Sequence, residues 1–374
     1  MDNKPYMLEN TGDLISPALV YYKDIILDNI KHAIRMAGGP QQLWPHVKSH
    51  KCAEMIRLQM SLGICRFKCA TVAEAEVTAE TGAQHVILAY PLVGPNISRY
   101  LRLAKMYPAT VFYAIGDDFD CISALAAEAC SLNMNINVLI DVDMGMHRTG
   151  VPLNMLQSLY ERTSGLKGIK VKGLHCYDGH CHDRDPVRRR EIVDEIDSRV
   201  LEIRDALKRG NYECEIMVMG GTPTFPCRIG KADFFLSPGT FFINDSGYYS
   251  GLPDLDFIPG AAVFSRVISH CGSKSGAGNN FTLDLGNKGI AADPAGPRGV
   301  IAGMEDAVPL FQSEEHWVFS LPAGKDLPPI GSECYVIPTH ICPTSALYPQ
   351  IQVAEAGKIT GQWQVSARNR KINY

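Results

Sequence analysis

Candidate reactive side chains occur together in several short segments of this 374-residue sequence. In the first, His46, Lys48 and His50 alternate directly after an apolar stretch that begins at Leu43. On an extended segment, alternate side chains share one face. A lysine amine that is partly desolvated at the end of a strand could form a Schiff base with a carbonyl compound. The alternative is a solvated run of polar residues on the surface.

Two further segments, 141–150 and 175–182, combine charged, imidazole and thiol groups. In the first, Arg148 could bind an anionic oxygen of a ligand through charge-assisted hydrogen bonds, or it could form a structural salt bridge. The second holds three histidines and two cysteines around Tyr177. It lacks the paired Cys-x-x-Cys spacing of a structural zinc site. It therefore predicts general acid–base chemistry by Tyr177 or a histidine, with metal binding as the alternative.

Two glycine-rich turns, 220–224 and 237–240, place backbone N–H donors next to threonine hydroxyls. Glycine allows a ligand to approach the backbone closely, and exposed N–H groups beside hydroxyls suit a phosphate. Either segment alone could be a simple turn, but the pair predicts a phosphate site.

A possible metal site lies further along the chain, where His340 and Cys342 are two residues apart. In an extended segment both side chains would face the same way and could bind one metal ion.

The elements that must position these groups follow from the periodicity of the chain. From residue 20 to 247, short apolar and β-branched runs alternate with helical stretches, which is typical of βα units around a parallel sheet. The expected strands are residues 43–47, 65–69, 85–89, 110–114, 136–142, 171–177, 216–219 and 234–236. This α/β pattern fits the roughly 250 residues of a (β/α)8 TIM-type barrel better than a doubly wound sheet. In such a barrel, the active groups lie at the carboxyl ends of the strands.

A second, mostly antiparallel β-domain is expected from residues 1–19 together with 248–374. After residue 247 the sequence consists of short runs rich in Val, Ile, Phe and Thr, broken by Gly and Pro, which is typical of antiparallel strands. The glycine-rich stretch 272–278 lacks the strand-before, helix-after setting of a phosphate loop and predicts a hairpin tip. This domain would carry the metal ligands.

The composition excludes several classes of protein. Lys and Arg number 36 against 40 Asp and Glu, a formal net charge of −4, so nucleic acid is not an expected partner. No apolar run approaches the roughly 18 residues of a membrane span, and no signal peptide is recognisable. The 12 cysteines are scattered through apolar segments, as expected for buried reduced thiols in a cytoplasmic protein. The expected partner is a small polar molecule.

Taken in order, the motifs resemble those of the D-threonine aldolase and D-serine dehydratase family, which is part of the alanine-racemase-like, fold-type III class of pyridoxal-phosphate enzymes. The resemblance rests on Pro-His-Val-Lys-Ser-His-Lys, Asp-Met-Gly-Met-His-Arg-Thr-Gly-Val, Gly-Gly-Thr-Pro-Thr, Ser-Pro-Gly-Thr-Phe and Pro-Thr-His-Ile-Cys-Pro-Thr. The match extends from about residue 14 to 370.

This resemblance implies an active site. Lys48 would hold pyridoxal 5′-phosphate as a Schiff base. The cofactor would also be contacted by His46, Arg148 and Tyr177, and its phosphate by Gly221, Thr222, Gly239 and Thr240. His340 and Cys342 would hold a divalent metal, zinc or manganese. The histidine that aldolases of this family carry six residues after the tyrosine is Asp183 here, so His180 or His182 is expected to activate the substrate hydroxyl.

The implied reaction is that of a lyase acting on D-3-hydroxy amino acids. Retro-aldol cleavage to glycine and an aldehyde, as in D-threonine aldolase, is the primary expectation, because residues 177–180 look like those of the aldolases. Dehydration, as in D-serine or D-3-hydroxyaspartate dehydratase, is the alternative, because Cys342 resembles the dehydratase metal ligand. A non-catalytic pyridoxal-phosphate carrier would need no metal pair. The family also implies a homodimer in which the β-domain of a partner chain closes the site.

Overall fold

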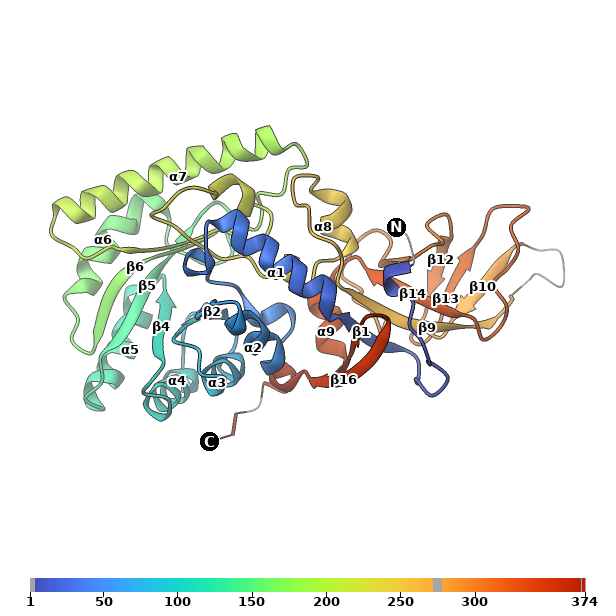
Figure 1. Cartoon of the computed structure of the whole chain (residues 1–374). Coiled ribbons are helices and arrows are strands. Elements are labelled where there is room, and N and C mark those ends of the chain that lie inside the picture. The colour runs from blue at the N-terminus through green and yellow to red at the C-terminus, as the bar shows by residue number, and fades with distance from the viewer. Residues whose placement is uncertain (1–3, 272–277, 371, 374) are drawn as a thin grey trace.

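The computed structural model describes residues 4–271, 278–370, 372 and 373, and it contains a parallel and a mostly antiparallel sheet (Figure 1). This arrangement confirms the expected α/β fold with a second β-rich part. Residues 272–277 of the predicted hairpin tip at 272–278 lie outside the described residues. Within the described residues, no helix combines the length and apolar character that a membrane span requires.

The parallel sheet contains seven strands in chain order. They are β2 (Arg66–Cys69), β3 (His85–Leu88), β4 (Val111–Gly116), β5 (Ile136–Asp143), β6 (Ile169–Tyr177), β7 (Ile216–Met219) and β8 (Phe235–Leu236). The strands are mostly buried, as expected where helices cover the outer face. Those helices are α1 (Lys23–Ala37), α2 (Ala53–Ser61), α3 (Val72–Glu80), α4 (Pro95–Met106), α5 (Phe119–Ser131), α6 (Leu153–Ser164) and α7 (Pro186–Arg209). The predicted strands from 65–69 onward therefore agree with the structure to within a few residues.

Residues 43–46 close this sheet into a barrel. The segment pairs in parallel with β8 at one end and, through His46, with Lys68 of β2 at the other. Two of its N–H groups donate to carbonyls next to β8 at 2.8 Å each, and the Lys68 N–H donates to the carbonyl of Pro45 at 2.7 Å. Proline has no N–H of its own to extend the ladder, so the contacts remain isolated bridges.

The predicted strand 43–47 is wrong in its last part. Val47–Ser49 forms a 3-10 turn that is capped by the His46 ring, whose Nδ1 accepts a hydrogen bond from the Lys48 N–H at 3.3 Å. His46, Lys48 and His50 therefore do not share a face through strand alternation. His46 and His50 are buried, whereas Lys48 is half-buried.

The second sheet combines strands from both ends of the chain. β1 (Ala18–Tyr22) pairs antiparallel with β9 (Ala261–Ser269) and parallel with β15 (Gln350–Glu355). The remaining strands are β10 (Asn280–Leu283), β11 (Gly299–Ile301), β12 (Val308–Gln312), β13 (Trp317–Ser320), β14 (Glu333–Pro338) and β16 (Lys358–Gln364). Helix α8 (Ser246–Gly251) connects β8 to β9, whereas α9 (Ile341–Leu347) lies between β14 and β15 in the sequence. In space, both short helices lie between the two sheets (Figure 1).

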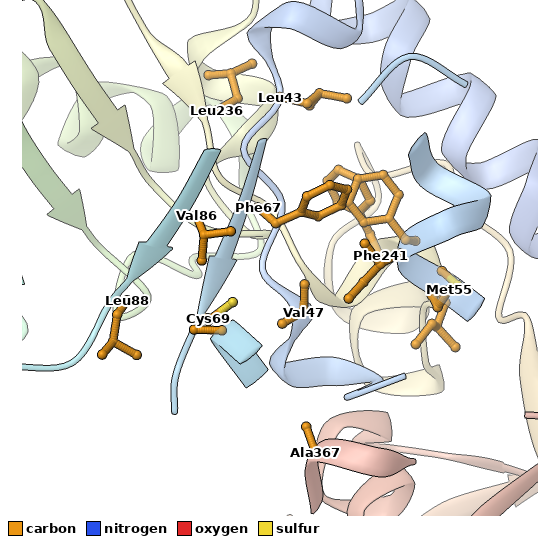
Figure 2. Close-up of a cluster of buried hydrophobic side chains, with 14 of the residues drawn as sticks. Leu43, Val47, Met55, Phe67, Cys69, Val86, Leu88, Leu236, Phe241 and Ala367 are labelled. Carbon is orange, nitrogen blue, oxygen red and sulfur yellow. The ribbon is translucent and has the colours of Figure 1, made fainter. Parts of the chain in front are cut away.

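A hydrophobic cluster anchors the turn that carries Lys48 (Figure 2). Val47 points into this cluster together with Phe67 of β2, Met55 of α2 and Ala367 from the C-terminal segment, and each is at most 1% exposed. Val47 and Lys48 are adjacent, so burying Val47 turns the lysine toward the other side of the chain.

A buried ionic cluster lies behind the turn 220–224. The guanidinium of Arg228 lies 2.7 Å from carboxylate oxygens of both Asp178 and Asp197. It also donates to Thr224 Oγ1 at 2.9 Å, and that hydroxyl donates to Asp178 at 2.8 Å. All four side chains are buried. The cluster connects the end of β6, helix α7 and the turn after β7.

Replacing Arg228 with Met should lower the free energy of unfolding by about 3–5 kcal/mol, because the buried carboxylate of Asp178 loses its counter-ion and that of Asp197 keeps only Lys231, at 3.3 Å. Urea denaturation measures the loss. The matched control is Arg188→Met, which removes a 3.3 Å pair with Asp183 whose arginine is 71% exposed; exposed pairs contribute only about 0–1 kcal/mol. Equally small losses in both variants would contradict the structural role of the cluster.

Candidate active site

A cavity of 760 Å³ opens at the carboxyl ends of the barrel strands. Its lining includes the Lys48 turn, β2, β6, the turns after β7 and β8, and α9, together with residues of α3, α4 and α8. The expected site residues that line it are His46, Lys48, Tyr177, Gly221, Thr222, Gly239, Thr240, His340 and Cys342. Segments far apart in the sequence are therefore brought to one cavity, as barrel topology requires.

Lys48 reaches this cavity from the turn described above. Its Nζ lies 5.6 Å from the centre of the Tyr177 ring. Lys51 also lines the cavity, but its amine forms an ion pair with the buried carboxylate of Glu74. This ion pair distinguishes the environment of Lys51 from that of Lys48.

Tyr177 at the end of β6 is surrounded by cations and glycines. The guanidinium carbon of Arg148 lies 4.8 Å from the ring centre, so Arg148 reaches the site through Tyr177 although it does not line the cavity. A Cβ atom at Gly221 would lie 2.9 Å from the ring, and one at Gly179 would collide with the ring and its hydroxyl. The glycines of both turns thus make room for this aromatic side chain.

The two predicted phosphate turns face each other across one hydroxyl. The N–H groups of Gly239 and Thr240 both donate to Thr222 Oγ1, at 3.3 and 3.2 Å. A Cβ atom at Gly239 would lie 3.1 Å from His46, so a side chain there would crowd the segment that leads to Lys48. Converging N–H groups beside a hydroxyl are the donor set that a phosphate needs, and the residues present therefore fit the expected group.

His340 and Cys342 meet at the start of α9 on the cavity wall. Cys342 is in the first helical turn, so this contact does not come from strand alternation as expected. Burial opposes charge on both groups, but their mutual hydrogen bond outweighs it, lowering the pKa of Cys342 and, with Asp293, raising that of His340 to about 9. The Cys342 sulfur also lies 3.1 Å from Ser49 Oγ and 3.3 Å from Thr240 Oγ1.

The donor set of this pair fits a catalytic metal better than a structural one. His340 Nδ1 donates to Asp293 Oδ2 at 2.5 Å, and a carboxylate at one ring nitrogen commonly orients the other toward a metal. A cysteine with a lowered pKa offers the thiolate that metals bind. In the described parts of the chain, no cluster of three or more His, Cys, Asp or Glu side chains could hold an ion. Two protein donors would leave positions open to water and substrate.

Sequence reasoning missed a buried polar chain inside the barrel. Lys68 Nζ lies 3.5 Å from His175 Nε2, and His175 Nδ1 lies 2.7 Å from Asp141 Oδ1. The three side chains are 2%, 4% and 3% exposed, and Lys68 lines the cavity. A signal was present, because Lys68 lies between Phe67 and Cys69 in β2 and His175 is two residues before Tyr177 on the same face of β6.

The structure places the expected bases His180 and His182 outside the lining of this cavity. His180 Nε2 lies 3.4 Å from the Cys181 sulfur, and His182 Nδ1 contacts the His180 carbonyl oxygen at 2.7 Å. His182 lines a neighbouring hollow of 540 Å³, which His340 also borders. A catalytic role for either histidine stays a prediction.

Comparison with known proteins supports the resemblance read from the motifs. Residues 23–242 match the alanine racemase N-terminal domain, and residues 260–354 match the putative serine dehydratase domain. The chain is 27% identical to the D-threonine aldolase of an Arthrobacter species over 87% of this chain and 85% of that protein. It is 23% identical to the D-threo-3-hydroxyaspartate dehydratase of a Delftia species over 94% and 97%. The crystal structure of D-threonine aldolase from Filomicrobium marinum, 25% identical, covers 96% of this chain and 97% of that chain with a TM-score of 0.87.

These similarities confirm the predicted family and the alanine-racemase-like fold. The family is pyridoxal-phosphate-dependent. The named relatives are aldolases and dehydratases, which are both lyases, and the expectation of a lyase is confirmed at that level. Because one family match spans more than half of the sequence, this chain belongs to the family of the alanine racemase N-terminal domain.

Proposed function

We propose that this protein is a pyridoxal-phosphate- and divalent-metal-dependent lyase that cleaves D-3-hydroxy amino acids, such as D-threonine, to glycine and an aldehyde. One observation carries the proposal. A single cavity is lined by Lys48 beside Tyr177, by the converging N–H groups of the phosphate turns, and by the His340–Cys342 pair. Substrate amine, cofactor and substrate hydroxyl thus have separate partners within one enclosed space.

Each group of residues has a distinct task in this proposal. Bound here, pyridoxal phosphate would supply a carbonyl carbon for amines and a ring that stores an electron pair. Lys48 is the nucleophilic amine that would hold this carbonyl until a substrate amine replaces it. The N–H groups of Gly239 and Thr240, with the Thr222 hydroxyl, would bind the phosphate. Tyr177, with Arg148 above its ring, would fix the ring plane.

The His340–Cys342 pair would hold zinc or manganese near the substrate hydroxyl. A divalent ion there acts as a Lewis acid and lowers the pKa of an alcohol that it binds. The Cys342 sulfur lies 3.3 Å from Thr240 Oγ1, so the proposed metal pair is adjacent to the proposed phosphate site. This adjacency supports a role for the metal on the substrate rather than in folding.

Dehydration remains a second candidate because of Cys342. In the family that the motifs resemble, the residue at this position is Asp in several aldolases and Cys in dehydratases. A dehydratase such as D-serine or D-3-hydroxyaspartate dehydratase would remove the α-proton and expel the hydroxyl, giving a keto acid and ammonia. The non-catalytic carrier gains no support from a cavity that includes the His340–Cys342 pair.

We also propose a cytoplasmic homodimer. The cavity wall includes Tyr90, which is 51% exposed, and the nearby Val93 is also 51% exposed. A partner chain covering this rim would exclude water from the reacting groups.

Lys48→Arg should abolish the near-visible absorbance of the lysine-bound cofactor, because a guanidinium cannot form the imine. Lys51→Arg is the matched control, since it removes a second lysine amine from the same cavity, three residues further along the chain, while keeping a cation for Glu74. Borohydride reduction followed by peptide mass spectrometry should find the cofactor on Lys48. Recovery on Lys51 would contradict the assignment.

Incubation with D-threonine and metal should yield glycine and acetaldehyde, because cleavage of Cα–Cβ is the proposed step. D-Serine should yield little pyruvate, and L-enantiomers should give neither product, since Lys48 and the His340–Cys342 pair have fixed positions on the cavity wall. Chromatography of the amino acids and carbonyl products measures the outcome. Pyruvate and ammonia as the only products would favour the dehydratase instead.

Removing the metal with EDTA should abolish turnover but leave the cofactor absorbance intact, because the proposed metal acts on the substrate hydroxyl. His340→Ala should lose bound metal, as measured by elemental analysis. His316→Ala, which changes an exposed histidine of the second sheet region, should retain it. Full turnover by metal-free protein would refute the metal's role.

A further inference from the structure

Lys68 is a second amine in the cavity, on the strand next to the Lys48 segment. Its Nζ lies 5.6 Å from the centre of the Tyr177 ring, the same distance as that of Lys48. The residue is 2% exposed and lines the cavity. It therefore faces the space in which the proposed reaction takes place and not the solvent.

The environment of Lys68 is unusual for a buried lysine. A buried ammonium group is normally paired with a carboxylate. Among the ion pairs of the described residues, none involves Lys68. Its neighbour is an imidazole, at 3.5 Å. Burial, and next the charge of Lys48, lower the pKa of Lys68 to about 7, so this amine can change its protonation state near neutral pH.

His175 holds Lys68 in place without neutralising it. Burial lowers the pKa of His175, which favours the neutral ring. The 2.7 Å contact with Asp141 Oδ1 places the ring proton on Nδ1. The lone pair of Nε2 then accepts a hydrogen bond from the Lys68 amine. Asp141 and His175 thus orient the amine of Lys68, a residue that lines the cavity.

We propose that Lys68 is a proton-transfer group of the active-site cavity, in addition to Lys48, and that His175 and Asp141 are its positioning residues. This inference rests on the proposed function. The reaction requires a base for the substrate hydroxyl, and neither His180 nor His182 lines this cavity.

The proton transfer balances over one turnover. The uncharged Lys68 amine accepts the proton of the substrate β-hydroxyl, and the electron pair of that O–H bond forms the aldehyde C=O bond. The Cα–Cβ bond breaks and its electron pair remains at Cα. The Lys68 ammonium then returns the proton to Cα, which gives glycine and restores the uncharged amine.

The sign of the pH dependence follows from this role. Lys68 must be uncharged to accept the proton, so turnover should rise with pH through its pKa and be lost below it. The charged and titratable groups that face Lys68 are Lys48, Arg148, His46, His175, Tyr177, Asp141 and Asp178. The negative charge of Asp141 raises the pKa of Lys68. Asp141→Asn should therefore move the acidic limb of the profile to lower pH.

The test uses Lys68→Gln, which can still donate to His175 Nε2, and Lys68→Met, which cannot. Both should retain cofactor absorbance but lose turnover by at least about 100-fold, the usual size of a general acid–base contribution, and both should lose the acidic limb near neutrality. Lys170→Met, at an exposed position of β6, is the control and should retain turnover.

A measurement on the cofactor-free full chain makes the inference independent of turnover. Competitive acetylation with acetic anhydride, read by mass spectrometry, should give Lys68 a midpoint near neutral pH, against about 10.4 for ordinary lysines. An ordinary midpoint would overturn the proposal even if the Lys68 variants failed to fold. So would retained turnover with an unchanged pH profile in Lys68→Gln. Absence of cofactor absorbance and turnover in the unaltered protein would instead refute the proposed function.

Discussion

The closure of the barrel by residues 43–46 is the constraint on which the site depends. This segment hydrogen-bonds to both β2 and β8, and it then leaves the sheet in the turn that carries Lys48. Burial of Val47 in the core directs the lysine toward the cavity. The same closure brings Gly239 within 3.1 Å of His46, counted from a Cβ built on the glycine. Lys48 and the turn 237–240 are therefore positioned by one set of contacts.

The barrel contains two kinds of buried charge, and they have different consequences. Arg228 lies between two buried carboxylates, of which Asp197 also pairs with Lys231 at 3.3 Å, so the charges of this cluster are paired. The cluster supports the turn 220–224 from behind. Lys68 lies against the neutral ring of His175 instead. Without a carboxylate partner, burial acts directly on its pKa. The first cluster stabilises the fold, whereas the second leaves an ionisable group available inside the cavity.

The site belongs to both sheets. Helix α9 follows β14 of the second sheet, yet Cys342 in its first turn contacts Ser49 and Thr240 of the barrel region. β1 contributes to this arrangement because it lies in the second sheet and leads directly into α1 of the barrel. The chain thus passes between the two parts after β1 and again between β8 and β9, and α9 contacts the barrel from the second sheet. The position of a metal held by His340 and Cys342 would consequently depend on how the two sheets are placed relative to each other.

The sequence by itself determined the alternation of strands and helices, and it also indicated the lysine, the two glycine turns and the His340–Cys342 pair, because these depend on local periodicity and motif spacing. It failed at two points where side-chain contacts decide the structure, one of them local and the other between distant residues. The cap from the His46 ring converts the end of the predicted first strand into a turn. Lys68 and His175 could not be paired from sequence, because they are 107 residues apart and lie on β2 and β6, which are not adjacent in the sheet and come together only inside the closed barrel. Tertiary structure alone supplies that burial, which makes Lys68 chemically different from any exposed lysine.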